Sequence, residues 1–600
     1  MAFKMNRIPA RTKSLTTKLK QRTTRLSVEG PIECSITGSV LLNNALYNKG
    51  TAFKPQEREE FNLKGLLPER VNSLDEQVER AYQQFRYLKT PLARNDFCTS
   101  MRRQNLVLYF ALVGRNIKEM LPIIYTPTEG DAIMAYSERF RKPEGCFLDI
   151  KSPETIEERL SLFGSAEDID YIVVSDGEGI LGIGDQGVGG VRISVAKLGL
   201  MTLCGGIHPG RVLPVALDVG TDNKRLLEDP LYVGNRFPRV RGKEYWEFID
   251  KFVHAVKKFF PKAVLHYEDF GVSNAKTMLE KYRGFIPSFN DDIQGTGSVV
   301  MASLIAALKY SSKNLEDCKV LIYGAGSAGL GVANQIYKSL VISGTDPEKA
   351  KGLVHLMDKK GLIKKSDNDA SEGQKLFAKE DKDWEGNDTK SLLEVVKKVK
   401  PDVLVGCSTQ PGSFTEEVIK EIYKHHKYPI VFPLSNPSRL HEAFPVDIMK
   451  WTENNALIAT GSPFEPVDGI DIAENNNCYT FPGIGLSAVL SRSKTISDSM
   501  INAGIEQLAS LSPRMSNPKA GLLPDIHHIN EVSARVATAM ILQALDEGVA
   551  TVESENKPNG EKVSVPRSFN ECLSWVKSQM WKAEYRPLLK TSYQDDEKTP

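Results

Sequence analysis

Two adjacent pairs of carboxylates are the residues of this 600-residue chain with the clearest chemical potential. Glu268 and Asp269 close one short apolar run, Asp291 and Asp292 close another, and glycine follows each pair within three residues. A buried strand delivers carboxylates in this way to the carboxyl-end rim of an α/β sheet, where such sheets bind ligands. Four carboxylates at one rim repel each other unless a cation neutralises them, and hard oxygen ligands suit Mg2+ or Mn2+. The pattern therefore predicts a divalent-metal site, with two unrelated acidic turns as the alternative.

Two further side chains are candidates for proton transfer. Lys197 lies in the mostly apolar segment 191–203. A lysine that stays buried there has a depressed pKa and can act as a base, whereas a lysine at a helix edge reaches solvent instead. Tyr125 lies between Pro122 and Pro127, which predicts a stiff, extended segment that suits a positioned proton donor. The alternative for a lone tyrosine is a packed aromatic ring with a satisfied hydroxyl.

A dinucleotide fingerprint follows a short apolar run in the second half of the chain. Gly324, Gly326 and Gly329 have the spacing Gly-x-Gly-x-x-Gly between a predicted strand and a predicted helix. Such glycines allow a tight turn and bring a pyrophosphate to the helix N-terminus. The next predicted strand ends in Asp358, the expected partner of the ribose hydroxyls. Because an acid there disfavours a 2′-phosphate, the sequence favours NAD over NADP.

Two asparagines are placed for polar binding. Asn436 follows another predicted strand and would hang over the cofactor, where its side chain can bond an amide or a carboxylate. Asn477 ends a run of three asparagines. Such a run is a solvated turn, unless the chain returns to the cleft at this point.

The elements that must position these residues alternate between strands and helices, which predicts an α/β fold with a largely parallel sheet. Apolar residues recur at helical spacing from Leu74 to Met120, and helices dominate again from Ser493 onward. A chain of this length is too long for one core. We expect a helical plus substrate and metal domain over 29–290, a Rossmann-type NAD domain over 291–550 and a C-terminal tail over 551–600.

Composition restricts the class of protein. The net charge of +1 argues against bulk electrostatic binding of nucleic acid or membrane. No apolar run approaches the roughly 20 residues that span a bilayer. The eight cysteines include no Cys-x-x-Cys pair, which is typical of a reducing compartment and a protein without structural zinc. We therefore expect a soluble intracellular protein.

The first 28 residues have the composition of a mitochondrial transit peptide. They carry eight lysines and arginines, many serines and threonines, and no acid before Glu29. This leader predicts the mitochondrial matrix, with a disordered basic tail on a cytosolic protein as the alternative.

Taken together, the motifs resemble those of the malic enzyme family from about Leu41 to Arg586, most closely its NAD-linked mitochondrial members. The segments that carry the resemblance are NKGTAF (48–53), YTPT (125–128), EDF (268–270), FNDDIQGT (289–296) and SNP (435–437). The resemblance implies a homotetramer and a set of site residues: Mg2+ or Mn2+ at Glu268, Asp269 and Asp292, Tyr125 as general acid, Lys197 as general base with Asp291 beside it, and substrate or nicotinamide contacts at Asn436 and Asn477.

One position departs from the family pattern. Gly179 stands where many members carry an arginine that clamps the substrate carboxylate, and related malolactic enzymes also have glycine there. The expected activity is oxidative decarboxylation of L-malate to pyruvate and CO2 with reduction of NAD. The alternative is malolactic turnover on the same residues, with NAD retained and lactate released. A catalytically silent dinucleotide-binding regulator is disfavoured, because nothing else would require Tyr125, Lys197 and both acidic pairs together.

Overall fold

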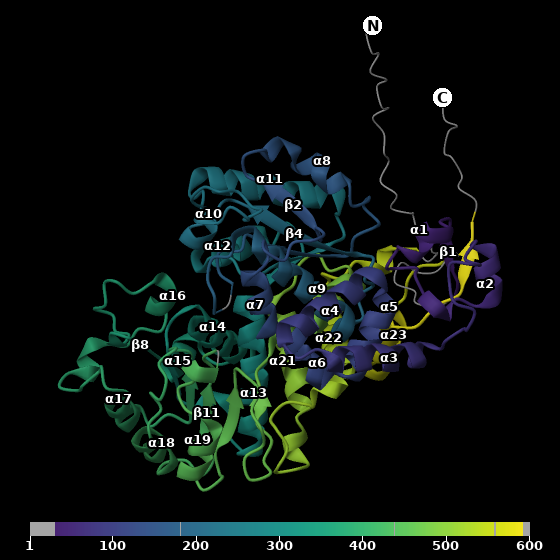
Figure 1. Ribbon diagram of the computed structural model, residues 1–600. Helices are drawn as coiled ribbons and strands as arrows, with labels where there is room; N and C mark the ends of the chain where they lie inside the picture. Colours follow the sequence, from purple (N-terminus) through teal and green to yellow (C-terminus); the bar gives the residue numbers. More distant parts are fainter. Residues whose placement is uncertain (1–29, 181, 437, 557–559, 592–600) are drawn as a thin grey trace.

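The computed structural model describes residues 30–180, 182–436, 438–556 and 560–591, so the predicted transit segment 1–28 lies outside the described residues (Figure 1). The described residues form two large, mostly parallel sheets, a small two-stranded sheet and a central group of helices.

The segment from Leu74 onward is helical, as predicted. Its helices are α3 (Leu74–Tyr87), α4 (Pro91–Gln104), α5 (Leu106–Arg115), α6 (Ile117–Ile124) and α7 (Thr128–Met134). Capping side chains set where these helices begin. Ser73 caps α3 in a reciprocal pair with Glu76, Thr90 caps α4, and Asn105 caps α5.

The prediction of an extended segment between Pro122 and Pro127 is wrong for its first part, because α6 continues through Pro122 to Ile124. A proline removes one intrahelical bond. Burial of Leu121, Ile123 and Ile124 on the neighbouring positions offsets that loss. Tyr125 is nevertheless extended, with φ −137° and ψ −155°, directly after the helix ends.

The first sheet has five parallel strands in the order β2-β4-β3-β5-β6. Its strands are β2 (Cys146–Asp149), β3 (Tyr171–Ser175), β4 (Val212–Asp218), β5 (Val264–Tyr267) and β6 (Ser288–Asn290), with helices α8 (Ile156–Ser161), α10 (Lys224–Glu228), α11 (Lys243–Phe259) and α12 (Val272–Tyr282) around it. In β3, Tyr171 and Val173 face the central core, whereas Ile172 and Val174 face the outer cluster that α11 covers. The strands of this sheet are apolar on both faces because each face of the sheet packs against one of these two clusters.

The second sheet has seven strands in the order β13-β12-β11-β10-β7-β8-β9, parallel except for β9. Its strands are β7 (Val320–Tyr323), β8 (Val354–Asp358), β9 (Gly361–Leu362), β10 (Val403–Gly406), β11 (Ile430–Pro433), β12 (Leu457–Thr460) and β13 (Ala473–Glu474). Its helices are α14 (Ser327–Ile342), α15 (Pro347–Leu353), α16 (Glu372–Lys375), α17 (Leu392–Val399), α18 (Glu416–Tyr423) and α19 (Pro445–Trp451). The chain runs from β7 to β8 on one side and returns as β10 on the other, so β7 borders the switch point where such sheets bind ligands.

Long buried helices share one hydrophobic core with the inner faces of the two large sheets. They are α9 (Val191–Gly205), α13 (Thr296–Tyr310), α20 (Phe481–Ser491), α21 (Asp498–Ser510) and α22 (Ile529–Asp546). The segment Gly187–Gly205 is long and apolar enough to cross a bilayer, but 83% of that window is buried inside the protein. We therefore assign α9 to the core, which gives its polar side chains a dry environment.

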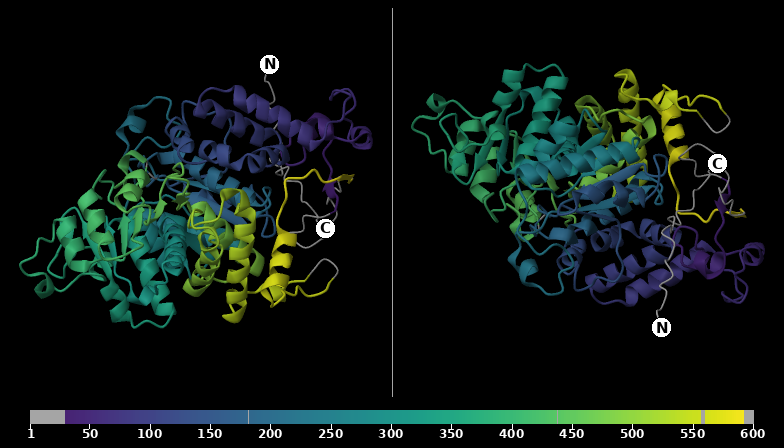
Figure 2. Two further views of the ribbon diagram at one scale, coloured as in Figure 1. Left: turned by 90° about the horizontal axis from the view of Figure 1, so that it is seen from below. Right: turned by 90° about the horizontal axis from the view of Figure 1, so that it is seen from above.

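The two ends of the described chain meet. β1 (Ile32–Cys34) pairs in parallel with β14 (Leu588–Lys590). The N-terminal helices α1 (Gly38–Leu42) and α2 (Pro55–Glu60) lie beside the C-terminal segment that follows α23 (Phe569–Gln579), as Figure 2 shows from two sides.

Candidate active site

The two acidic pairs meet at one edge of the five-stranded sheet, as predicted. β5 and β6 are parallel neighbours with Tyr267 opposite Asn290, so Glu268 and Asp291 directly follow the ends of the two strands. The Asp269 N–H donates to Asp292 Oδ2 at 2.9 Å. Carboxylate oxygens of Glu268, Asp269 and Asp292 all lie within 4.8 Å of one another. The set that the resemblance implied as metal ligands is thus assembled.

The backbone at this edge is specialised. Asp269 has φ +53°, a left-handed conformation that costs a non-glycine residue about 1 kcal/mol or more and is common at functional sites. Asp291–Gly295 forms a π-helical turn, η4, another feature found mostly at such sites. A side chain at Gly295 would place its first carbon 1.7 Å from Asp291 Oδ1, so only glycine fits there.

The carboxylates have the properties of a cation site. Burial, helped by the repulsion of Asp291, raises the pKa of Glu268 to about 7. Burial and the charge of Glu268 raise the pKa of Asp292 to about 8. Among the described residues, Asp291 Oδ1 and Asp292 Oδ1 are buried without a hydrogen-bond partner, which is rare in folded proteins. An all-oxygen donor set of this kind fits Mg2+ or Mn2+.

His266 supports this cluster and was not predicted. Its Nε2 lies 2.7 Å from Glu268 Oε2, and its Nδ1 lies 3.0 Å from the Tyr171 hydroxyl. Burial lowers its pKa to about 3, so the ring is neutral and orients the carboxylate. The available signal was its position two residues before Glu268, because side chains two residues apart along an extended run point to the same face.

Lys197 projects from α9 into the same cluster and is only 1% exposed. Its Nζ lies 3.0 Å from Glu268 Oε1 and is also in contact with Asp291 Oδ2. The prediction that burial depresses its pKa is wrong. Burial does lower the pKa, but attraction by Asp291 and Glu268 outweighs it and holds the pKa well above the usual value.

Tyr125 lies beside this lysine, with the Lys197 Nζ 5.3 Å from its ring centroid. The same ammonium lies 4.6 Å from the ring of Phe481. Burial raises the pKa of the Tyr125 hydroxyl far above its ordinary value, although the charge of Lys197 opposes this. Tyr125 therefore keeps its proton at neutral pH, as a general acid must before it acts.

A buried polar network holds the Tyr125 segment in place. Asn95 Nδ2 donates to the Ile123 carbonyl and to Glu129 Oε2, both at 2.8 Å. Arg192 Nε donates to Glu129 Oε1 at 2.7 Å. Since Arg192 is on α9, the helix that carries the lysine also anchors the tyrosine segment.

The two predicted asparagines have different surroundings. Asn477 Nδ2 donates to Asp291 Oδ2 at 3.0 Å and to the Thr296 hydroxyl at 3.1 Å, so the chain does return to the cleft here. Asn436 is exposed and accepts a hydrogen bond from Ser462 rather than contacting the carboxylates.

The glycine fingerprint forms the turn between β7 and α14. Gly324 has φ +112°, and a side chain on it would place its first carbon 2.3 Å from the Cys407 carbonyl carbon. A side chain on Gly329 would come within 2.0 Å of the Gly324 carbonyl oxygen, whereas Gly326 faces open space. Asp358 ends β8 and accepts a bond from the Lys360 N–H at 2.7 Å. This arrangement leaves room for a pyrophosphate at the helix N-terminus.

Gly179 packs directly on the acidic loop. Its N–H donates to the Asp269 carbonyl at 2.9 Å, and a side chain would place its first carbon 2.6 Å from the Phe270 carbonyl oxygen. A larger residue therefore has no space here while the loop keeps this position.

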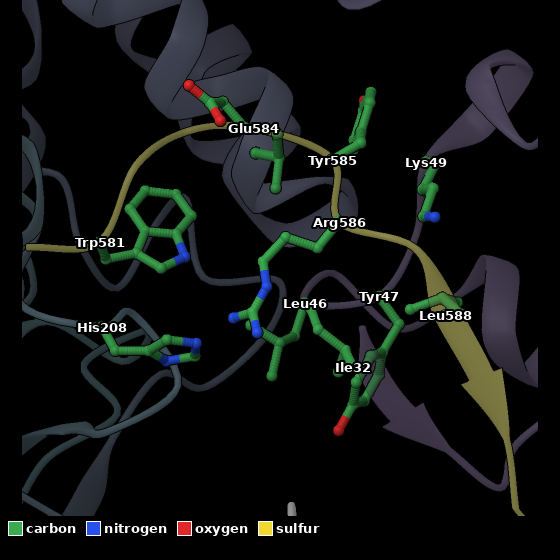
Figure 3. Close-up of a pocket in the computed structure, with 11 residues that line it drawn as sticks. Ile32, Leu46, Tyr47, Lys49, His208, Trp581, Glu584, Tyr585, Arg586 and Leu588 are labelled. Atoms are coloured by element: carbon green, nitrogen blue, oxygen red, sulfur yellow. The ribbon is translucent and has the colours of Figure 1, made fainter. Parts of the chain in front are cut away.

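A separate small cavity lies where the chain ends meet (Figure 3). Trp581 and Arg586 of the C-terminal segment line it together with His208, Lys49 and Tyr47. Its volume of about 20 Å3 admits a water molecule but no substrate, and none of its lining residues belongs to the carboxylate cluster.

The sequence matches two family descriptions: "Malic enzyme, N-terminal domain" over residues 102–283 and "Malic enzyme, NAD binding domain" over residues 293–545. A relative from Saccharomyces cerevisiae, named "NAD-dependent malic enzyme, mitochondrial", is 63% identical over 575 residues, which cover 95% of this chain and 86% of that protein. A relative from Schizosaccharomyces pombe, named "NAD-dependent malic enzyme", is 43% identical over 93% of this chain and 99% of that protein.

A crystal structure of Entamoeba histolytica malic enzyme has the same fold, with a TM-score of 0.52 and 22% identity over 86% of this chain and 90% of that one.

Proposed function

Because the chain belongs to the malic enzyme family, we propose that the cluster around Lys197 and Glu268 is where it oxidatively decarboxylates L-malate to pyruvate and CO2 with NAD. This assignment rests on one observation, which is that the proposed catalytic side chains lie in contact with one another in a buried cluster. The Lys197 ammonium lies between Glu268 and Asp291 and beside the Tyr125 ring. A base, an acid and an oxygen-rich cation site are thus within reach of one small molecule.

Glu268, Asp269 and Asp292 would hold Mg2+ or Mn2+. Gly324, Gly326, Gly329 and Asp358 would hold NAD, with Asn436 and Asn477 toward the nicotinamide and the substrate. When bound, the cation would supply Lewis-acid polarisation of the C2 oxygen, and NAD would supply the acceptor for the C2 hydride.

The chain's own residues then move protons. Lys197 takes the proton of the C2 hydroxyl, and Asp291, in contact with its Nζ, can take a proton from the ammonium so that the amine is free to act. After CO2 has left, Tyr125 donates its proton to the C3 carbon of the pyruvate enolate, and the neighbouring Lys197 ammonium can pass on the proton taken from the C2 hydroxyl, which restores both residues. The buried Tyr125 hydroxyl keeps its own proton until this step.

The product distinguishes this reaction from malolactic turnover. Incubation with L-malate, NAD and Mn2+ should give one NADH and one pyruvate per malate, and EDTA should stop the reaction until Mn2+ or Mg2+ is restored. Loss of malate with lactate accumulating and no free NADH would establish the alternative. The relatives described above are named NAD-dependent malic enzymes and lend that alternative no support.

We also propose the mitochondrial matrix as the location, with residues 1–28 as the transit peptide. The basic leader and the mitochondrial name of the Saccharomyces cerevisiae relative support it. Import of a fusion of residues 1–40 to a fluorescent protein tests the leader by itself.

A homotetramer is proposed from the family, as are domains over 29–290 and 291–550 with a tail over 551–600. Sedimentation of the purified protein and limited proteolysis test these two points.

A further inference from the structure

A buried carboxylate outside the cluster joins two loops of the seven-stranded sheet. Glu442 is 0% exposed and follows the short turn after β11. Its Oε1 accepts hydrogen bonds from the Ser408 N–H at 2.8 Å, the Ser408 hydroxyl at 2.8 Å and the Ser435 hydroxyl at 2.5 Å. One oxygen therefore holds both the loop after β10 and the loop after β11.

Ser435, which donates to the Glu442 carboxylate, also contacts the loop after β10. The Ser435 oxygen accepts a bond from the Thr409 N–H at 2.9 Å, and Thr409 has the left-handed φ of +55°. The backbone of Glu442 also bonds this loop, since its carbonyl accepts from the Phe414 N–H at 3.0 Å. Gly406 gives the carboxylate its space, because a side chain there would place its first carbon 2.5 Å from Glu442 Cδ.

These two loops belong to the cofactor edge of the sheet. Cys407, one residue before Ser408, lies against Gly324 of the fingerprint turn. Asn436 comes directly after Ser435 and is exposed at the same edge. In the strand order, β8 with Asp358 lies on one side of β7, and β10 and β11 lie on the other. A dinucleotide across this edge, as the proposed function requires, has its adenosine at β8, its pyrophosphate at β7 and its nicotinamide toward β10 and β11.

We propose that Glu442 is a positioning residue that fixes the loops after β10 and β11 and so determines how tightly the nicotinamide half of NAD is held. One acceptor oxygen at this position serves all three donors, and hydrogen bonds to a carboxylate are stronger than those between neutral groups. Without it, the Ser408 and Ser435 hydroxyl groups and the Ser408 N–H lose their common acceptor, and the loops lose the link between them.

The test compares the binding of NADH with that of ADP, which occupies only the adenosine and pyrophosphate positions. Kd is measured by titration calorimetry for the wild type, Glu442→Ala and Glu442→Gln. We expect Glu442→Ala to weaken NADH about tenfold or more, as loss of a charged hydrogen bond predicts, and ADP less than about twofold. Glu442→Gln keeps one acceptor oxygen and should recover most of the NADH affinity.

Thr452→Val is the matched control for general destabilisation of this domain. Thr452 is also 0% exposed, and its hydroxyl donates to the Ile448 carbonyl at the end of α19 without touching either loop. It should lower the thermal midpoint and leave both Kd values unchanged. Equal weakening of NADH and ADP by Glu442→Ala, or no weakening of NADH, would overturn the positioning role. A wild type that binds neither probe would instead reject the proposed cofactor site itself.

Discussion

Replacing Gly179 by alanine tests whether the acidic loop is held at the position that a cation needs. The new methyl carbon would lie 2.6 Å from the Phe270 carbonyl oxygen, whereas ordinary contacts begin at 3.4 Å. The loop must therefore move by about 0.8 Å, while metal–ligand distances in proteins vary by only about 0.2 Å. Asp269 is directly before Phe270, so its carboxylate moves with the loop.

We expect Gly179→Ala to raise the Mn2+ concentration for half-maximal activity by about 10- to 100-fold, the size of effect seen when a supporting contact of a metal site is lost. This corresponds to about 1.4 to 2.8 kcal/mol of cation-binding free energy. Gly179→Arg should be worse, because its side chain begins at the same blocked position.

Electron paramagnetic resonance of free Mn2+ during titration measures the affinity without turnover, and NADH absorbance gives the activation curve. Gly284→Ala is the control, since that glycine follows α12 in the same part of the chain and a side chain there meets nothing within 4 Å. Wild-type Mn2+ affinity in Gly179→Ala would refute the claim that this contact holds the acidic loop in place.

Three further outcomes are expected. Tyr125→Phe should lose decarboxylation and the tautomerisation of enolpyruvate while retaining more hydride transfer, and equal loss in every partial reaction would contradict a separate acid. Arg192→Met should lower the thermal midpoint, because it leaves the buried Glu129 carboxylate with the Asn95 amide but without its cation, and Glu129→Gln in the same chain should recover part of that loss. If the double variant is no more stable than Arg192→Met, the ion pair is not what holds this segment. Asp358→Ser should narrow the preference for NAD over NADP in kcat/KM, and a wild type that prefers NADP would show that Lys359 or Lys360, which directly follow Asp358, dominates instead.

The sequence by itself was enough to place the acidic pairs together. Glu268 and Asp291 each follow a short apolar strand, and parallel strands in one sheet end at the same edge, so their meeting requires only the α/β pattern. The turn at Gly324 was predictable for a similar reason, because its three glycines and the elements around them lie within one continuous segment.

Other features depended on contacts between residues far apart in the chain. Lys197 has a raised rather than a depressed pKa because Asp291, 94 residues later, lies against its ammonium. Glu442 joins Ser408 and Ser435 only because β10 and β11 are neighbours in the folded sheet. Whether burial stabilises or destabilises the charged form of a side chain depends on which charged groups are buried next to it. Local periodicity in the sequence carries no information about those groups. The tertiary structure therefore decided the protonation and support of these groups, while the sequence had already determined their types and the edges at which they lie.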